Sequence, residues 1–136
     1  MKDSIRTPLA KVRGLGSAKS GTSHFLWQRI TAIILIPLTW WFIYSLLHIA
    51  NGGSQELVIA WMASSANAAA LIIMLMAVFY HAALGMQVII EDYIHCPSIK
   101  LSSLLLNAVL MFAFAIISIL AVLTLHFHMI PQGVAE

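Results

Sequence analysis

One histidine of this chain, His81, lies deep within a long apolar segment, where an imidazole requires a specific partner. About 14 Å of helix separates it from the nearer end of that segment at Ile90. Three roles fit this depth: a hydrogen bond to a serine, threonine or asparagine of another helix, an axial ligand of a haem iron, or a proton-relay group. On a helical projection, Gly85, Val88 and Asp92 fall within about 40° of His81 and form one stripe with it. A glycine one turn from a ligand lets a flat ring approach the backbone, although glycine also serves membrane helices as a packing residue.

A low-spin b-type haem would need a second axial ligand at nearly the same depth as His81. His48 differs from His81 by about 13 Å in height, judged from helix rise. The other histidines also lie nearer one or other membrane surface: His24, His95, His126 and His128. Any haem bound by His81 would therefore be shared with a second polypeptide or another copy of this chain.

The apolar segment that holds His81 ends in an unusual cluster of two acids and a phenol, Glu91, Asp92 and Tyr93. Tyrosine is common at a membrane interface, and acids that follow a span need only be solvated. The cluster also fits a quinone-type site, in which a phenol donates a hydrogen bond to a carbonyl oxygen and a carboxylate organises proton entry. These three residues alone do not specify that substrate.

Arg29 is the last positive charge before 26 uncharged residues. One interpretation is a topology anchor whose side chain extends to lipid phosphate. The other is a guanidinium that faces an anionic group, such as a haem propionate, from the cytoplasmic side.

These residues must be positioned by membrane helices, because 61% of the 136 residues are hydrophobic, 9% are charged and the mean hydropathy is +0.94. The charge-free stretches predict an all-α membrane protein with three transmembrane helices, at about 30–50, 67–90 and 101–127. The first ends at a cluster of turn formers, residues 51–54. The net charge of +2 and the lone Cys96 exclude a basic nucleic-acid binder and a disulfide scaffold.

The positive charges predict how the chain crosses the membrane. All seven lysines and arginines precede the first span or lie between the second and third, which predicts a cytoplasmic N-terminus and a periplasmic C-terminus. We therefore expect a basic cytoplasmic segment at 1–29, a three-helix membrane anchor at 30–128 and a periplasmic tail at 129–136. Because the first segment lacks the apolar stretch and cleavage site of a secretory signal, we expect it to be retained.

Two stretches of the sequence resemble the small hydrophobic membrane anchor subunit of succinate dehydrogenase, respiratory complex II. Residues 81–93, HAALGMQVIIEDY, are similar to the family signature H-A-x-x-G-M followed by D-Y. Residues 23–33, SHFLWQRITAI, are similar to the stretch that enters the family's first span. The three-helix plan agrees, and the basic, glycine-containing leader at 1–21 resembles the alphaproteobacterial form.

The resemblance implies a subunit of the bacterial inner membrane that has no complete active site of its own. It implies pairing with a second, cytochrome b-type anchor subunit and docking of the iron–sulfur and flavoprotein subunits on the cytoplasmic side. It also implies that His81 ligates a haem b shared with the partner anchor, that Arg29 lies near a propionate, and that His24 lies near a propionate or the proton path. Tyr93 and Asp92 would border the site where ubiquinone is reduced, with Tyr93 donating to a quinone oxygen.

Two alternatives remain open at this point. An anchor of quinol:fumarate reductase would have the same plan and run the reverse reaction, because direction depends on cofactor potentials that lie mainly on other chains. A haem-free structural protein or small transport component would use His81 as a packing or proton-binding group. A transporter is expected to show more buried ionisable residues or broken helices, and apart from Pro37 the spans show neither. Three histidines match nothing in the family pattern: His48, His126 and His128.

Overall fold

The computed structural model describes residue 9 and residues 21–129. Three long helices, α2 (Gly21–Gly52), α4 (Ser65–Tyr93) and α5 (Pro97–Met129), are joined by short connections and one short helix, α3 (Gln55–Ala63). Each long helix contains a stretch that is long and apolar enough to cross a membrane. The prediction of an all-α protein with three candidate membrane-spanning helices is therefore confirmed.

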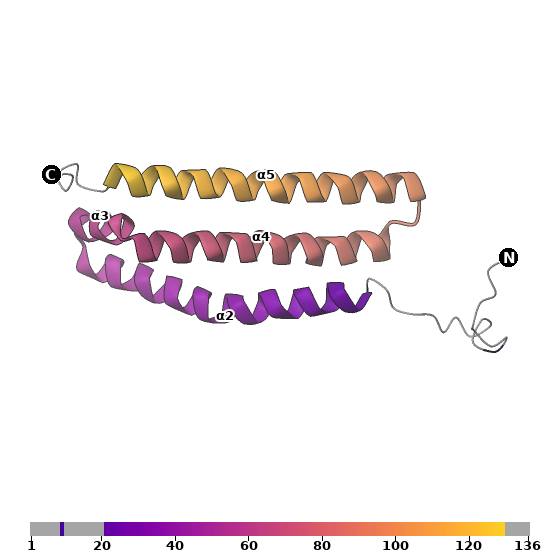
Figure 1. Ribbon diagram of the computed structural model, residues 1–136, viewed down its shortest axis with the longest axis horizontal. Coiled ribbons are helices and arrows are strands. Elements are labelled where there is room, and N and C mark those ends of the chain that lie inside the picture. The colour runs from indigo at the N-terminus through magenta and orange to yellow at the C-terminus, as the bar shows by residue number, and fades with distance from the viewer. Residues whose placement is uncertain (1–8, 10–20, 130–136) are drawn as a thin grey trace.

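The long helices lie side by side in one layer, with α4 in the middle (Figure 1). Helix α4 packs against both α2 and α5, whereas α2 and α5 do not pack against each other within the described residues. A single layer buries little, and its buried apolar side chains are Ala68, Leu84 and Ile90. Both broad faces of the layer therefore remain apolar and exposed, as expected of a chain surrounded by lipid and other subunits.

The helices extend beyond the spans expected from composition. Helix α2 begins at Gly21, nine residues before the expected span, and α5 begins at Pro97, four residues before its own. Hydropathy detects only the segment that suits the hydrocarbon, whereas the backbone remains helical into the polar surroundings until a residue breaks it. Pro97 suits a first helical position, because its fixed φ is helical and its missing N–H would have had no partner there.

The predicted turn at residues 51–54 forms between α2 and α3. Gly53 adopts a φ of +61° and its N–H donates to the carbonyl of Ile49 at 3.2 Å, which ends α2. The Ser54 hydroxyl then accepts from the Leu57 N–H at 3.3 Å and caps the start of α3. The segment between the first two expected spans, which contains Trp61, thus forms a helix of its own.

Candidate functional site

His81 lies on the face of α4 that contacts α2, and a polar side chain of α2 lies near each nitrogen of its ring. Thr31 Oγ1 lies 2.9 Å from His81 Nδ1. Gln28 Nε2 lies 3.4 Å from His81 Nε2. The interhelical hydrogen bond to a threonine, one of the three roles considered for His81, is therefore present. The hydrogen bond to Thr31 involves only Nδ1, so it does not by itself exclude a ligand role for Nε2.

A cavity of about 550 Å³ opens beside Gln28, between the first turns of α2 and the last turns of α4. Its lining is partly polar: Gly21, His24, Phe25, Gln28, Gly85, Gln87, Val88 and Glu91. Two buried side-chain atoms of this lining, His24 Nε2 and Gln28 Oε1, have no hydrogen-bond partner in the described part of the chain. Because buried polar atoms are almost always hydrogen-bonded, the pair indicates a place for a polar ligand group.

Gly85 lies where the expected stripe below His81 places it, and it faces α2. A Cβ built at Gly85 would lie 3.6 Å from Gln28 Nε2, an ordinary van der Waals distance. The glycine therefore keeps the Gln28 amide and the cavity side of His81 free of a side chain from α4. It does not contribute a backbone conformation that other residues avoid.

The two cationic candidates from the start of α2 lie differently with respect to this cavity. His24 lines it directly. The exposed Arg29 side chain places its guanidinium carbon 4.7 Å from the centre of the Phe25 ring, and Phe25 also lines the cavity. Such a cation–π contact holds the charge beside the cavity mouth rather than within it.

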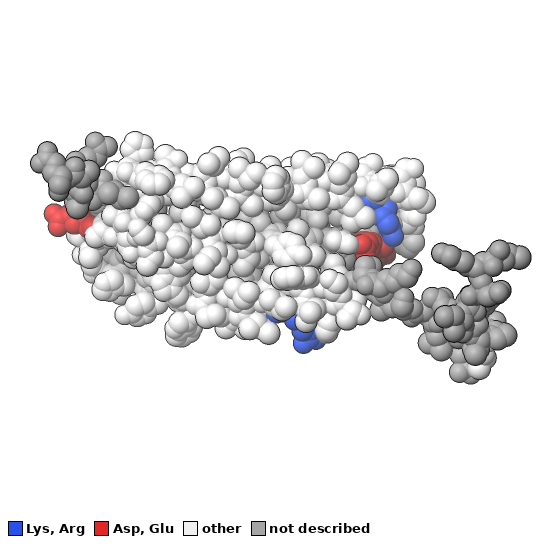
Figure 2. Space-filling model, in the orientation of Figure 1, with Lys and Arg blue, Asp and Glu red and all other residues white. Residues whose placement is uncertain are grey.

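The acidic end of α4 forms a polar rim separate from His81. Tyr93 is 78% exposed and lies 12 residues beyond His81, or about 18 Å along the helix. Glu91 is held locally, since its carboxylate accepts from Gln87 at 2.7 Å and its carbonyl accepts from Lys100 Nζ at 2.7 Å. Figure 2 shows that the visible lysine and arginine side chains all lie in the half of the bundle that holds the α4–α5 connection.

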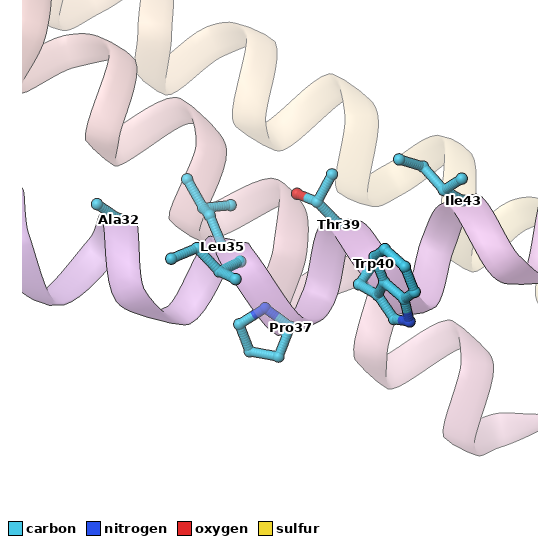
Figure 3. A pocket seen from close by; sticks show the side chains of 7 residues that line it. Ala32, Leu35, Pro37, Thr39, Trp40 and Ile43 are labelled. Atoms are coloured by element: carbon cyan, nitrogen blue, oxygen red, sulfur yellow. The ribbon is translucent and has the colours of Figure 1, made fainter.

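Another cavity, of about 580 Å³, lies on the exposed face of α2 around Pro37 (Figure 3). All of its lining residues belong to that one helix: Ala32, Leu35, Ile36, Pro37, Thr39, Trp40 and Ile43. None of these side chains titrates or carries charge. The groove can therefore contact apolar groups, but it offers no chemistry comparable with the His81 site.

The sequence did not identify Gln28 and Thr31 as the partners of His81, although a signal was present. With His24 they are spaced four and three residues apart, which places three polar side chains on one face of an otherwise apolar helix. Such a polar stripe predicts a buried contact with another membrane helix. Which helix supplies the contact depends on the packing of α2 against α4, and this cannot be obtained from spacing alone.

Another histidine, His126, is buried near the end of α5 and was unassigned by sequence. Its Nδ1 donates to the Met62 carbonyl of α3 at 2.8 Å. The neighbouring Trp61 carbonyl accepts from the Asn67 side chain at 2.9 Å, and the Trp61 ring stacks on Trp41 at 5.7 Å. His126 therefore belongs to the packing of α3, whereas His48 and His128 are exposed.

Comparison with known proteins agrees with the three apolar helices and the two sequence stretches. Residues 3–130 match the family model described as succinate dehydrogenase/fumarate reductase transmembrane subunit. The chain is 42% identical over 125 residues to the succinate dehydrogenase hydrophobic membrane anchor subunit of Rickettsia bellii, covering 91% of this chain and 95% of that protein. It is 40% identical over 90 residues to the protein of the same name from Rickettsia conorii, covering 66% and 71% of the two chains.

A more distant relative is the succinate dehydrogenase membrane anchor subunit of Reclinomonas americana, which is 30% identical over 94 residues and covers 68% of this chain and 78% of its own length. These relatives and the three apolar helices indicate a multi-pass protein of the bacterial inner membrane. The resemblance to the alphaproteobacterial form is thereby confirmed. The chain belongs to the succinate dehydrogenase/fumarate reductase transmembrane subunit family, as a membrane anchor subunit.

Proposed function

We propose that this chain is an anchor subunit of a succinate:ubiquinone oxidoreductase that supplies one axial ligand of a haem b and part of the ubiquinone site. The observation that carries the proposal is His81, an imidazole inside an apolar helix. Its Nε2 faces Gln28, which lines a cavity where two buried polar atoms have no hydrogen-bond partner among the described residues. The iron–sulfur and flavoprotein subunits would dock at the end of the layer that carries the α4–α5 connection. A second anchor subunit would cover an exposed face of the layer. The catalytic activity would belong to the whole complex.

The residues around His81 fit a haem ligand. A neutral histidine binds iron through the ring nitrogen that carries no proton. Thr31 satisfies Nδ1, and the contact to Nε2 comes only from the flexible Gln28 side chain at 3.4 Å, beyond the usual hydrogen-bond range. A bound haem b would supply a one-electron redox centre. By helix rise, no other histidine of residues 21–129 lies at the depth of His81, so the second ligand of the iron would come from the partner anchor.

His24 and Arg29 are suited to the propionates of that haem. His24 Nε2 is buried, has no hydrogen-bond partner among residues 21–129, and can donate to a carboxylate. Arg29 holds a permanent positive charge beside the Phe25 wall of the cavity. An equally direct use of His24 is to pass protons from the polar rim, since the cavity also reaches Glu91.

At the rim, Tyr93 and Asp92 would serve the quinone. Reduction of ubiquinone to quinol consumes two electrons, which the iron–sulfur subunit would deliver, and two protons. The Tyr93 side chain is exposed, and its hydroxyl makes no hydrogen bond within the described residues, so it is free to donate to a quinone carbonyl. The exposed Asp92 carboxylate would help to bring protons to the same place.

The charges of the helices support an orientation. Lys100 lies in the first turn of α5, next to the α4–α5 connection, Arg29 lies in the first turns of α2, and Glu56 lies in α3. By the positive-inside rule, residues 1–29 and the α4–α5 connection would lie in the cytoplasm. The region 30–128 would form the membrane anchor, and residues 129–136, outside the described part, would form the periplasmic tail.

The test is a dithionite-reduced minus oxidised visible spectrum of the detergent-purified complex, recorded for wild type and His81→Leu and normalised to protein. We expect sharp b-type bands in wild type and their loss in an assembled His81→Leu complex. Unchanged bands in the variant would contradict the ligand assignment. No bands in an intact wild-type complex would remove haem from the proposal and leave His81 as a packing residue.

A further inference from the structure

Thr31 is one of the few buried polar residues of the layer, with 5% of its surface exposed. A threonine in a membrane helix commonly satisfies its hydroxyl by donating to a carbonyl three or four residues earlier. Thr31 does so, since Oγ1 lies 2.9 Å from the Trp27 carbonyl and 3.1 Å from the Gln28 carbonyl. The threonine therefore does not need His81 to satisfy its own hydrogen, and the additional contact serves the histidine.

The hydrogens of these groups assign a direction to that contact. A hydroxyl has one hydrogen and two lone pairs, and the hydrogen of Thr31 is directed to the carbonyls of its own helix. Thr31 Oγ1 then accepts from the Nδ1–H of His81 at 2.9 Å. The opposite tautomer would direct an Nε2–H at the Gln28 amide nitrogen, so that two donors would face each other.

We propose that Thr31 is a positioning residue for His81: its hydroxyl accepts the Nδ1–H, fixes the ring tautomer and orientation, and tunes Nε2 as a ligand. This inference rests on the proposed ligation of haem b by His81. It goes beyond that ligation because it assigns the properties of the ligand to a residue of another helix, 50 positions earlier in the chain.

A hydrogen bond donated from the distal nitrogen makes an imidazole a more basic ligand. A more basic ligand stabilises ferric over ferrous iron and lowers the midpoint potential of the haem. Removing the Thr31 hydroxyl is therefore expected to raise that potential. A tenfold change in the relative stability of the two oxidation states corresponds to 59 mV for one electron, and we expect a rise of up to about this size.

The experiment uses the purified complex with Thr31→Val, which keeps the shape of the side chain but removes the hydroxyl. Thr31→Ser keeps the hydroxyl and serves as the rescue. Thr39→Val is the matched control, because Thr39 lies on the same helix but is exposed in the groove around Pro37 (Figure 3). For each variant, the midpoint potential of the haem is obtained by redox titration, and the g values of its ferric form by electron paramagnetic resonance.

We expect a higher potential and altered g values in Thr31→Val alone, with Thr31→Ser and Thr39→Val close to wild type. Wild-type values in a haem-loaded Thr31→Val complex would overturn the proposal. If Thr31→Val loses haem, Thr31→Ala and Thr31→Ser decide: haem retained only with serine supports the proposal, and the same outcome for both contradicts it. Failure of the ligand assignment itself would be seen separately, as b-type bands that persist in His81→Leu.

Discussion

His81 lies near the middle of α4 and His126 near the end of α5, and each makes an interhelical hydrogen bond through Nδ1. The partner of His126 is a backbone atom, the Met62 carbonyl near the end of α3, at 2.8 Å. The partner of His81 is the Thr31 side chain, at 2.9 Å. His126 is 7% exposed and packed against its surroundings. Gln28, which faces His81 Nε2, instead lines a cavity where two buried polar atoms have no partner among the described residues.

This difference separates a structural histidine from a candidate ligand. The last carbonyls of a helix have no partner within that helix, so His126 satisfies a backbone group that α3 leaves open. Thr31 is already satisfied by its own helix, so its contact with His81 repairs no backbone defect. The identity of the partner and the use of the second ring nitrogen distinguish a structural histidine from a ligand better than depth in an apolar segment does.

The largest expected difference between the two histidines is in the haem content of the complex after each is replaced. His81→Leu should remove haem from the complex, while His126→Leu should retain it at the wild-type ratio to protein, because His126 contacts α3 rather than the cavity. The measurement is the pyridine haemochrome content of both purified complexes. Loss of haem in His126→Leu, with the complex assembled, would break the comparison and indicate a haem site near His126.

The expected effect of removing His126 is on stability rather than on haem content. His126→Leu leaves the Met62 carbonyl without its donor and is expected to lower the free energy of unfolding by about 1–3 kcal/mol. The control is His128→Leu, because His128 is exposed two residues further along α5. Equilibrium unfolding of the complexes in mixed detergent–SDS micelles measures the difference. Equal destabilisation by the two substitutions would show that the Met62 contact has no specific role.

Sequence reasoning recovered the three long helices because hydropathy over some 20 residues is a strong signal in a membrane protein. It singled out His81 because an imidazole is exceptional in such a segment. It did not find Thr31 and Gln28 as partners, nor the role of His126, because these contacts join residues 50–64 positions apart. Contacts of that kind depend on which faces of neighbouring helices meet. The site roles assigned from the sequence remain predictions: His81, Arg29, His24, Tyr93 and Asp92.

Two glycines provide a smaller test of the contrast between a structural position and a position beside the candidate ligand. Gly53 ends α2 with a φ of +61°, in a region that an L-residue enters at a cost of about 1–2 kcal/mol, so Gly53→Ala should destabilise the chain by that amount. Gly85→Ala should not destabilise it, because its Cβ would meet Gln28 Nε2 at an ordinary 3.6 Å and alanine favours a helix. The unfolding assay in mixed micelles compares them. A destabilising Gly85→Ala would show that the cavity end is packed more tightly than these contacts indicate.

The smallest expected effect concerns two exposed tyrosines, Tyr93 at the rim and Tyr44 toward the other end, which are 78% and 67% exposed. One neutral hydrogen bond contributes about 0.5–1.5 kcal/mol, so Tyr93→Phe should lower succinate-driven ubiquinone reduction about two- to thirteenfold. Tyr44→Phe should leave it unchanged. Succinate oxidation with an artificial acceptor, measured in parallel, should persist in both variants, because that reaction does not use the quinone site. If Tyr93→Phe lowers both activities equally, the tyrosine supports docking of the partner subunits rather than binding of the quinone. The rim at the end of α4 would then be a contact surface for those subunits.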